Sequence, residues 1–349
     1  MEEQKDMLGL LDLMTQPAFC VKEDQILRLN PAARQLLLQA GDRISPLLLT
    51  GGEEYAQFSG GCLHLTLSLE GQSVGASVQR VEDMDVFVLE PEEDGCALRA
   101  MALAAAELRR PLADAMTGAA ALLDSQADPQ TLQRLNRSLY QMLRMVGNMA
   151  DADVTGCRME TTDAGAFFRE VFEKAQTLLS RSGITLVYED WQETICCLLD
   201  TRQLERAVLN LLSNAAKFNP KGGQITASLT RRGRTLYLSI QDSGSGIAQE
   251  VMGTLFRRYQ RQPGIEDSRF GLGLGLKLIQ NAAREHGGTL LVTPAEAGGT
   301  RIVLTLAIRQ SRQSGLRSPV FSVDYTGGYD HALVELADCL SSELYDGSF

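Results

Sequence analysis

Three polar residues near the middle of the chain carry side chains that together could hold a metal ion and a phosphate group. Asn210, Asn214 and Lys217 belong to the run Asn-Leu-Leu-Ser-Asn-Ala-Ala-Lys-Phe. Apolar residues around them recur at helical spacing, which places the three polar side chains on the opposite face of a helix. An amide oxygen suits Mg²⁺ as a ligand, and an ammonium group one turn further along suits a phosphate oxygen. This helix face is therefore a candidate phosphate site.

Two glycine-containing clusters follow where a ligand could approach the backbone. The segment 242–247, Asp-Ser-Gly-Ser-Gly-Ile, follows an alternating apolar run and so begins where a half-buried strand ends. The Asp242 carboxylate can accept a hydrogen bond from an adenine amine, and glycines without a Cβ let a flat base come close. The segment 271–276, Gly-Leu-Gly-Leu-Gly-Leu, precedes an expected helix over 277–286, where free N–H groups form an anion cradle.

Each cluster alone also has an ordinary structural explanation. Paired asparagines occur on solvated helix faces, Asp-x-Gly-x-Gly occurs in turns, and glycine-rich loops are common. The order and spacing of the three clusters together favour a nucleotide site.

The stretch from Thr162 to Leu306 resembles the ATP-binding domain of sensor histidine kinases, which has the Bergerat-type fold also used by gyrase-like ATPases. Segment 210–218 resembles the N box, 242–247 the first glycine box, 255–261 a loose F box and 271–276 the second glycine box, and His286-Gly-Gly is similar to the family's ending. The resemblance implies that Asn214 holds Mg²⁺, that Asn210 and Lys217 line the phosphate side, that Asp242 binds adenine, and that 247–271 is a mobile lid.

The resemblance also implies which residues form the pocket for the cofactors ATP and Mg²⁺. They are Asn210, Asn214, Lys217, Phe218, Asp242, Gly244, Gly246, Ile247, Gly271, Leu272, Gly273, Leu274, Gly275, Leu276 and Thr300. Among them, Asn210 is the candidate for a catalytic role, and Asn214 is the metal ligand.

Residues 96–152 are expected to form a helical hairpin, because apolar residues repeat at alternating steps of three and four on both sides of a break at Pro129. The first series is Leu98, Met101, Ala105, Leu108, Leu112, Ala115, Ala119 and Leu122, and the second is Leu132, Leu135, Leu139, Met142, Val146 and Met149. A dimeric four-helix bundle would cover this stripe, as would packing of the hairpin within one chain. Similarity to the dimerisation and phosphotransfer domain of histidine kinases favours the homodimer.

This hairpin departs from the family at the residue that accepts phosphate. The family's box reads Ser-His-Glu-Leu-Arg-Thr/Asn-Pro-Leu, whereas this chain has Ala106 in place of His and Arg110 in place of Thr or Asn. A methyl group cannot accept phosphate, and a guanidinium cannot serve as a general base. No self-phosphorylation is therefore expected at this position. Pro111 lacks an N–H and should kink the helix.

Residues 6–92 are expected to form a small α+β domain that resembles a PAS sensor. Short helices are expected over 8–14 and 32–40, two short strands over 19–29, and three longer strands between 62 and 90. The order of elements and the run 25–34 carry the resemblance, which implies a ligand space between helix and sheet; a sheet used only for dimerisation is the alternative. His64 alternates with Leu63 and Leu65, so we expect it to face away from the core, without a ligand.

The remaining residues, 309–349, contain a polar link and an expected helix from Asp330 to Tyr345 with Leu333, Leu336 and Leu340 on one face. His331 is expected to be a polar residue at the helix start, with a role as an alternative phosphate acceptor the less favoured interpretation. His286 is expected to end its helix, where a cation suits the helix dipole.

Composition excludes several classes of partner. The net charge of -11 argues against nucleic acid and an anionic membrane. The seven cysteines are an odd number without a Cys-x-x-Cys pair, which indicates reduced thiols. No apolar run is long enough to span a bilayer and the first residues lack a signal peptide's basic start, so we expect a cytoplasmic protein without a membrane span.

The sequence thus predicts a multidomain α+β protein: a PAS-like α/β sensor (6–92), a dimeric helical hairpin (96–152), an α/β-sandwich ATP-binding domain of Bergerat type (160–308), and a tail (309–349). We expect a histidine kinase homologue, a pseudokinase at the usual site, that binds Mg-ATP and acts as a regulatory or scaffold partner in two-component signal transduction. Its partners would be a response regulator or another histidine kinase. Two alternatives stay open, namely the active ATP half of a heterodimer that phosphorylates a partner's His, and a Ser kinase or ATPase of the anti-sigma type.

Overall fold

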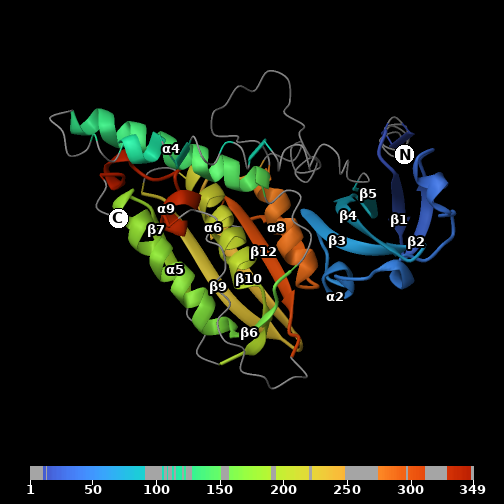
Figure 1. The fold of residues 1–349 in the computed structure, drawn as a ribbon. Coiled ribbons are helices and arrows are strands. Elements are labelled where there is room, and N and C mark those ends of the chain that lie inside the picture. The colour runs from blue at the N-terminus through green and yellow to red at the C-terminus, as the bar shows by residue number, and fades with distance from the viewer. Residues whose placement is uncertain are drawn as a thin grey trace.

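The structure is a computed structural model of the chain (Figure 1). It describes residues 11–12, 14–90, 128–150, 157–189, 194–219, 222–247, 274–295, 298–310 and 328–346, together with 104–105, 108, 112–113, 115–119 and 122. No helix among these residues has both the length and the apolar character needed to cross a membrane.

The first lobe is an antiparallel sheet with short helices at one side. Its strands follow the order β2-β1-β5-β4-β3. Their bounds are β1 Ala18–Lys22, β2 Gln25–Leu29, β3 Cys62–Leu69, β4 Gln72–Val81 and β5 Met84–Leu89. The helical pieces are the 3₁₀ helices η1 Ala33–Leu36 and η2 Ser45–Leu47 and the α-helix α2 Gly52–Ala56.

Two features of the first lobe differ from the expectation. The helix expected over 32–40 is only one 3₁₀ turn, η1, because Leu37 adopts a left-handed conformation with φ of 55° and ends it. Buried Asn30 starts this turn, since its Oδ1 accepts hydrogen bonds from the N–H groups of Ala33 and Ala18. His64, expected to face away from the core, is buried because helix α8 of the second lobe packs on β3.

The second lobe is a sheet covered on one face by helices (Figure 1). Its strands follow the order β11-β12-β10-β9-β7, antiparallel except for the parallel pair β9 and β7, and β6 and β8 form a separate pair. The strands are β6 Glu160–Asp163, β7 Thr185–Glu189, β8 Cys196–Leu199, β9 Gln224–Arg232, β10 Thr235–Asp242, β11 Leu290–Pro294 and β12 Thr300–Ala307. The helices are α5 Ala164–Arg181, α6 Thr201–Lys217 and α8 Leu274–Glu285.

Strand β3 of the first lobe pairs with β11 of the second, so all described strands except β6 and β8 form one sheet of ten. Leu290, Leu291 and Val292 stand opposite His64, Leu63 and Cys62. Gly61, with φ of 85°, comes so close to this junction that an added Cβ would lie 2.2 Å from the Val292 carbonyl oxygen. The junction therefore depends on a residue without a side chain.

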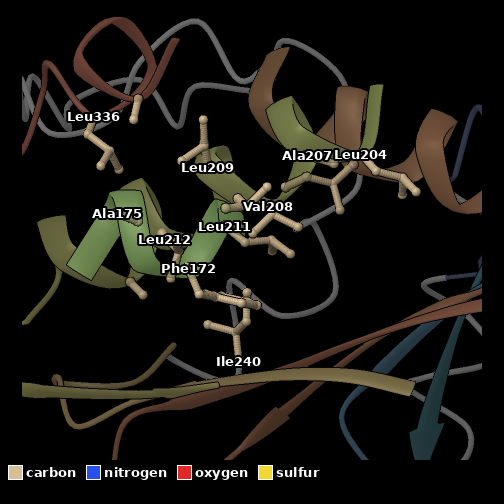
Figure 2. Close-up of a cluster of buried hydrophobic side chains, with 14 of the residues drawn as sticks. Phe172, Ala175, Leu204, Ala207, Val208, Leu209, Leu211, Leu212, Ile240 and Leu336 are labelled. Carbon is tan, nitrogen blue, oxygen red and sulfur yellow. The ribbon is translucent and has the colours of Figure 1, made fainter. Parts of the chain in front are cut away.

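Helix α6 lies between the sheet and a C-terminal segment, which explains its nearly continuous apolar character. Figure 2 shows Ile240 of β10 on one side of the helix layer and Leu336 on the other. The N-terminus of α6 is capped by Asp200, whose carboxylate accepts a hydrogen bond from the Gln203 N–H at 3.0 Å. A helix buried on two sides in this way needs partners for every polar group it carries.

Helix α4, Pro129–Ala150, is the second helix of the expected hairpin and lies along the top of the second lobe in Figure 1. Its expected apolar stripe is divided between two environments. Leu132, Leu139 and Val146 are buried, whereas Leu135 and Met142 are 42% and 44% exposed. The packing within one chain thus buries three of the six residues and partly buries Met149, while Leu135 and Met142 stay on the surface.

The C-terminal residues 328–346 form a compact segment on α4, α5 and α6. The continuous helix expected from Asp330 to Tyr345 is instead α9, His331–Glu335, followed by turns and the 3₁₀ helix η4, Ser342–Leu344. The leucines expected on one face, at 333, 336 and 340, are all buried. The apolar pattern thus indicated the contact surface correctly and the helix length wrongly.

Candidate functional site

Helix α6 positions the three polar residues of the predicted phosphate side. Its apolar residues Leu204, Val208 and Leu211 pack into the core, so the polar residues lie on the remaining face. Asn210 is 0% exposed, Lys217 forms the last residue of the helix, and Asn214 is half-buried between them. The helix predicted from the sequence is confirmed, but its polar face is covered.

Asn210 is held by three elements at once. Its Oδ1 accepts a hydrogen bond from Arg144 Nη2 of α4 at 2.8 Å, and its Nδ2 donates to Glu335 Oε2 of α9 at 3.0 Å and to the Arg206 carbonyl at 3.0 Å. The start of α8 lies beside it, because a Cβ on Gly275 would be 3.0 Å from Asn210 Oδ1. The amide predicted for the phosphate side therefore lies next to the helix predicted to follow the phosphate-binding glycines.

Lys217 lies near a second acidic side chain of the C-terminal segment. Its ammonium group forms an ion pair with Asp338, which also pairs with Arg144. Burial would raise the pKa of the Asp338 carboxyl, but Arg144 and Lys217 hold this pKa below its ordinary value. Asp338 is thus a charged group at neutral pH.

Asp242 ends β10 and is fixed by backbone donors. Its Oδ1 accepts hydrogen bonds from the N–H groups of Gly244 at 2.8 Å and Thr300 at 3.2 Å. Burial raises the pKa of the Asp242 carboxyl, although both N–H groups act in the opposite direction. Gly299, with φ of 92°, approaches so closely that a Cβ would lie 2.1 Å from the Asp242 carbonyl oxygen.

The glycine box is next to the end of α6. A Cβ on Gly244 would lie 2.4 Å from the carbonyl oxygen of Phe218, which is the residue after α6. Gly246 has a left-handed φ of 74°, and a Cβ there would lie 3.2 Å from the Gly299 carbonyl oxygen. Ile247 packs at the edge of the core. The structure therefore brings together the C-terminal end of α6, the residues after β10 and the start of β12.

Other predicted positions lie outside the described residues. These are Ala106, Arg110, Pro111, Gly271, Leu272 and Gly273, the F-box segment 255–261 and most of the expected lid. Leu274, Gly275 and Leu276 form the first turn of α8.

The two remaining histidines of this lobe and its tail have structural surroundings. His286 lies at the end of α8 as expected, but it is neutral rather than a cation. Its Nδ1 lies 2.7 Å from the Ala282 carbonyl and its Nε2 accepts from the Asp200 N–H at 3.0 Å, while burial lowers its pKa. His331 is the first residue of α9, as expected, and its Nδ1 lies 2.9 Å from Glu205 Oε2.

Four residues that contact the predicted phosphate side were not predicted from the sequence: Arg144, Arg206, Glu335 and Asp338. Local periodicity gives no sign of contacts between residues this far apart in the chain. One signal was present, because Arg206 lies four residues before Asn210 and so shares its face of α6. A buried arginine needs a carboxylate partner, which was a reason to search the acidic C-terminal segment.

Part of the second lobe matches a known protein family. Residues 199–310 match the model of the family described as histidine kinase-, DNA gyrase B- and HSP90-like ATPases. These residues extend from the end of β8 to the end of β12 and include α6, Asp242 and α8. The matched region thus contains the described part of the candidate site.

Several curated proteins are similar to parts of the chain. Histidine protein kinase DivJ of Caulobacter vibrioides is 38% identical over 109 residues, which cover 31% of this chain and 18% of that protein. Sensor histidine kinase Hik2 of Thermosynechococcus vestitus is 37% identical over 134 residues, or 38% of this chain and 35% of that protein. Sensor protein CreC of Escherichia coli is 28% identical over 208 residues, or 57% and 43%. The chain spans less than half the length of each of these relatives.

Among solved structures, full-length ShkA in complex with AMPPNP is similar in fold. The TM-score is 0.50 at 19% sequence identity, and the match covers 61% of this chain and 46% of that one. At this level of identity the likeness concerns the fold alone.

Proposed function

The chain belongs to the sensor histidine kinase family, and from this premise we propose that residues 160–308 bind Mg-ATP in a pocket between α6, α8 and the end of β10. The observation that carries the proposal is the placement of Asp242. This buried carboxylate is fixed through Oδ1 by two backbone N–H groups, with glycines on both sides of it. We expect its Oδ2 to accept the adenine amine.

The residues around Asp242 fit the adenine base of a nucleotide. Positions 244 and 299 have no space for a Cβ because the backbone of Phe218 and Asp242 lies against them, so glycine at both positions lets the surrounding segments hold Asp242 in place. Thr300 and Ile247 would border the base, and Phe218 would close the site at the end of α6. A carboxylate anchored by fixed donors recognises an amine without first having to reorganise.

The residues on the other side of the site suit phosphates. Asn210 and Lys217 are hydrogen-bond donors on one helix face, and Asn214 between them would supply an amide oxygen to Mg²⁺. The glycine run 271–276 would supply backbone N–H groups at the start of α8. A bound Mg²⁺ would neutralise the charge of the phosphates there. Asn210 and Lys217 would orient the phosphates.

The same chain has no residue at the usual position that could receive the phosphate. Ala106 occupies the position of the acceptor His, and Arg110 that of the Thr or Asn beside it. We therefore assign the protein the role of a regulatory or scaffold partner in two-component signalling, which binds ATP without storing phosphate on its hairpin. A PAS-like sensor formed by residues 6–92 would supply the signal.

A homodimer formed through residues 96–152 belongs to this proposal. Support comes from large apolar side chains on the surface of the hairpin. Leu108, Leu122, Leu135, Met142 and Met145 are each more than 40% exposed in the single chain. A second copy would remove them from water, which favours association.

The test is incubation with γ-labelled ATP of the wild type, Ala106→His and, as a matched control, Ala106→Gln. We expect the wild type and the glutamine variant to bind ATP without covalent label, and the histidine variant to acquire acid-labile label. Robust self-phosphorylation of the wild type would contradict the proposal. Absence of ATP binding in all three proteins would contradict the proposed nucleotide site itself.

A heterodimer in which this lobe phosphorylates a His on a partner kinase is the second candidate. The observation favouring it is that Asp242 is fixed by two backbone N–H groups in a chain with Ala106 at the position of the acceptor His. The regulatory role and the transfer role are distinguished by mixing the protein and labelled ATP with a candidate partner kinase whose own ATP site has been inactivated by substitution. Label on the partner alone would establish transfer, and no label on either chain would leave the regulatory role.

A further inference from the structure

The C-terminal segment 328–346 is packed on the second lobe as firmly as a core element. Leu333, Leu336 and Leu340 are buried, and Leu336 lies on the side of α6 that faces away from the sheet (Figure 2). Tyr345, 2% exposed, donates a hydrogen bond from its hydroxyl to the Leu333 carbonyl at 2.9 Å, which closes the segment on itself. The position of the segment is therefore set by apolar burial.

This apolar packing places Glu335 against the predicted phosphate side. Glu335 is 0% exposed, and its two carboxylate oxygens accept hydrogen bonds from Asn210 Nδ2 at 3.0 Å and from Arg206 Nε at 2.9 Å. Arg144 Nε lies 3.3 Å from the same carboxylate. A buried carboxylate has few alternatives to such donors, so its position is closely fixed.

Asp338, one turn further along, engages the second donor of that side. It forms ion pairs with Lys217 and Arg144. Asn210 and Lys217, the two α6 side chains assigned to phosphate oxygens, thus both contact carboxylates of the C-terminal segment. These are the contacts that anionic phosphate oxygens would make.

A carboxylate and a phosphate oxygen cannot use one donor group in the same place, and two like charges at that distance repel. From this shared set of donors we propose that the C-terminal segment 328–346 is a built-in competitor of the nucleotide phosphates, which must withdraw before the phosphates reach Asn210 and Lys217. The inference rests on the proposed Mg-ATP site. It adds an inhibitory contact within the chain, and the described hydrogen bonds of the Asp242 side chain are made with Gly244 and Thr300 and not with this segment.

Withdrawal of the segment would also free α4. Asn136 donates a hydrogen bond to the Tyr345 carbonyl at 3.0 Å, and Arg137 donates to the carbonyls of Ala337 and Asp338 at 3.0 Å each. The segment thus links the hairpin helix to the nucleotide lobe. Arg144, held by Glu335 and Asp338, would then be a second cationic side chain, beside Lys217, facing the phosphates.

Hydrogen exchange on the full wild-type chain tests the competition directly. At saturating Mg-ATP, amides of residues 328–346 should exchange faster than in the nucleotide-free protein, whereas saturating adenosine should leave them protected. Adenosine is the matched ligand because it can fill the adenine side and has no phosphates. Bound ATP with unchanged or slower exchange in this segment would overturn the proposal.

A variant with one charge removed tests the competition by changing the protein instead of the ligand. Asp338→Asn removes one competing charge and keeps the apolar anchors, and the side chain is 28% exposed, so the fold should persist. We expect ATP to bind roughly tenfold more tightly, a gain of about 1.4 kcal/mol, with adenosine affinity unchanged. Glu343→Gln, an exposed carboxylate in the same segment, is the matched control and should bind ATP as the wild type does.

The outcomes separate this inference from the proposed function. Equal ATP affinity of the wild type and both variants, measured by calorimetry with melting temperatures as a check on folding, would overturn the inference and leave the ATP site standing. If none of the three proteins binds ATP or adenosine, the proposed function fails, and the competitor has nothing with which to compete.

Discussion

Lys277 and Glu90 form an ion pair across the junction of the two lobes, with Lys277 Nζ 3.0 Å from Glu90 Oε2. Lys277 belongs to the first turn of α8, the helix that follows the glycine run, while Glu90 follows the last strand of the first lobe. His64 Nε2 lies 3.1 Å from the other oxygen of the same carboxylate. A buried polar contact thus connects the predicted sensor to the start of the helix predicted to bind phosphate.

Glu90→Gln should destabilise this junction, because it removes the charge opposite a nearly buried ammonium group. We expect the free energy of unfolding to fall by about 3 kcal/mol, measured by urea denaturation at pH 7. Glu173→Gln, an exposed carboxylate on α5, is the control and should be nearly neutral. An equal effect of both substitutions would show that the ion pair contributes nothing.

The difference in stability between wild type and Glu90→Gln should depend on pH in one direction. Burial would raise the pKa of Glu90, but His64 and Lys277 lower it further, so its pKa in the folded protein lies well below the ordinary value of 4.5. Stability from such a group is present above pH 4.5 and is lost as the pH falls toward the folded-state pKa. The difference between wild type and Glu90→Gln should therefore shrink below about pH 4.5. A difference that grows on acidification would contradict this assignment.

Gly61→Ala should destabilise the chain more than Gly71→Ala. Both glycines have left-handed φ, 85° and 81°, so alanine costs about 1–2 kcal/mol of backbone strain at either position. Only at Gly61 would the new methyl group meet a backbone carbonyl, at 2.2 Å, whereas nothing lies within 4 Å at Gly71. Chemical denaturation should show an additional loss of about 2 kcal/mol for Gly61→Ala. Equal losses would mean that the strands at the junction separate easily.

Asp242→Asn should weaken ATP binding with little effect on folding. The asparagine oxygen still accepts the two backbone N–H groups, but its amide would point a donor at the adenine amine. A lost hydrogen bond to a charged group corresponds to about 1.5–3 kcal/mol, or roughly tenfold to a hundredfold in affinity. Titration with a fluorescent ATP analogue measures this loss, with Asp83→Asn on the first lobe as the control. Unchanged affinity would place the adenine elsewhere.

The exposed half of the α4 stripe should govern self-association. Leu135 and Met142 are seven residues apart, so they lie on one helix face, and replacing both by Glu should weaken a homodimer by roughly a hundredfold, since each buried side chain contributes about 1.5–3 kcal/mol. Gln130→Glu, exposed on the same helix, is the control. Sedimentation equilibrium measures the change. A wild-type protein that stays monomeric at high concentration would contradict the dimer.

His286→Gln should reduce the loss of stability on mild acidification. Burial lowers the pKa of His286 below its ordinary value of 6.5, so the unfolded chain binds a proton more readily than the folded one. Stability therefore falls as the pH drops below 6.5 and stops falling below the folded-state pKa. Melting temperatures between pH 7.5 and 5.5 should fall more steeply for wild type than for the variant. Parallel slopes would show that His286 does not contribute.

Local patterns in the sequence were sufficient to predict the elements that carry the candidate site. The helix containing Asn210 and the strand ending at Asp242 follow from apolar periods of 3.6 and 2, which depend only on neighbouring residues. The close approach of Gly244 to the end of α6 agrees with the order of the predicted boxes. The roles of these residues toward ATP remain predictions.

Contacts between distant segments were not predictable in the same way. The burial of His64 depends on α8 packing against β3, and the burial of Asn210 depends on Glu335, 125 residues away. The burial of one side of α4 has the same origin, since the C-terminal segment contacts Asn136 and Tyr140 through Tyr345. Periodicity identifies a face that will be covered, but it does not identify what covers it.

The pairing of β3 with β11 has a consequence for dividing this protein into parts. Either lobe expressed alone would display a bare strand with unused N–H and C=O groups, and such an edge recruits other chains into aggregates. A foreign domain grafted onto the second lobe would have to bring its own strand in matching register, with a residue as small as Gly61 at the turn before it. The boundary between the lobes is therefore a poor place at which to cut or recombine this chain.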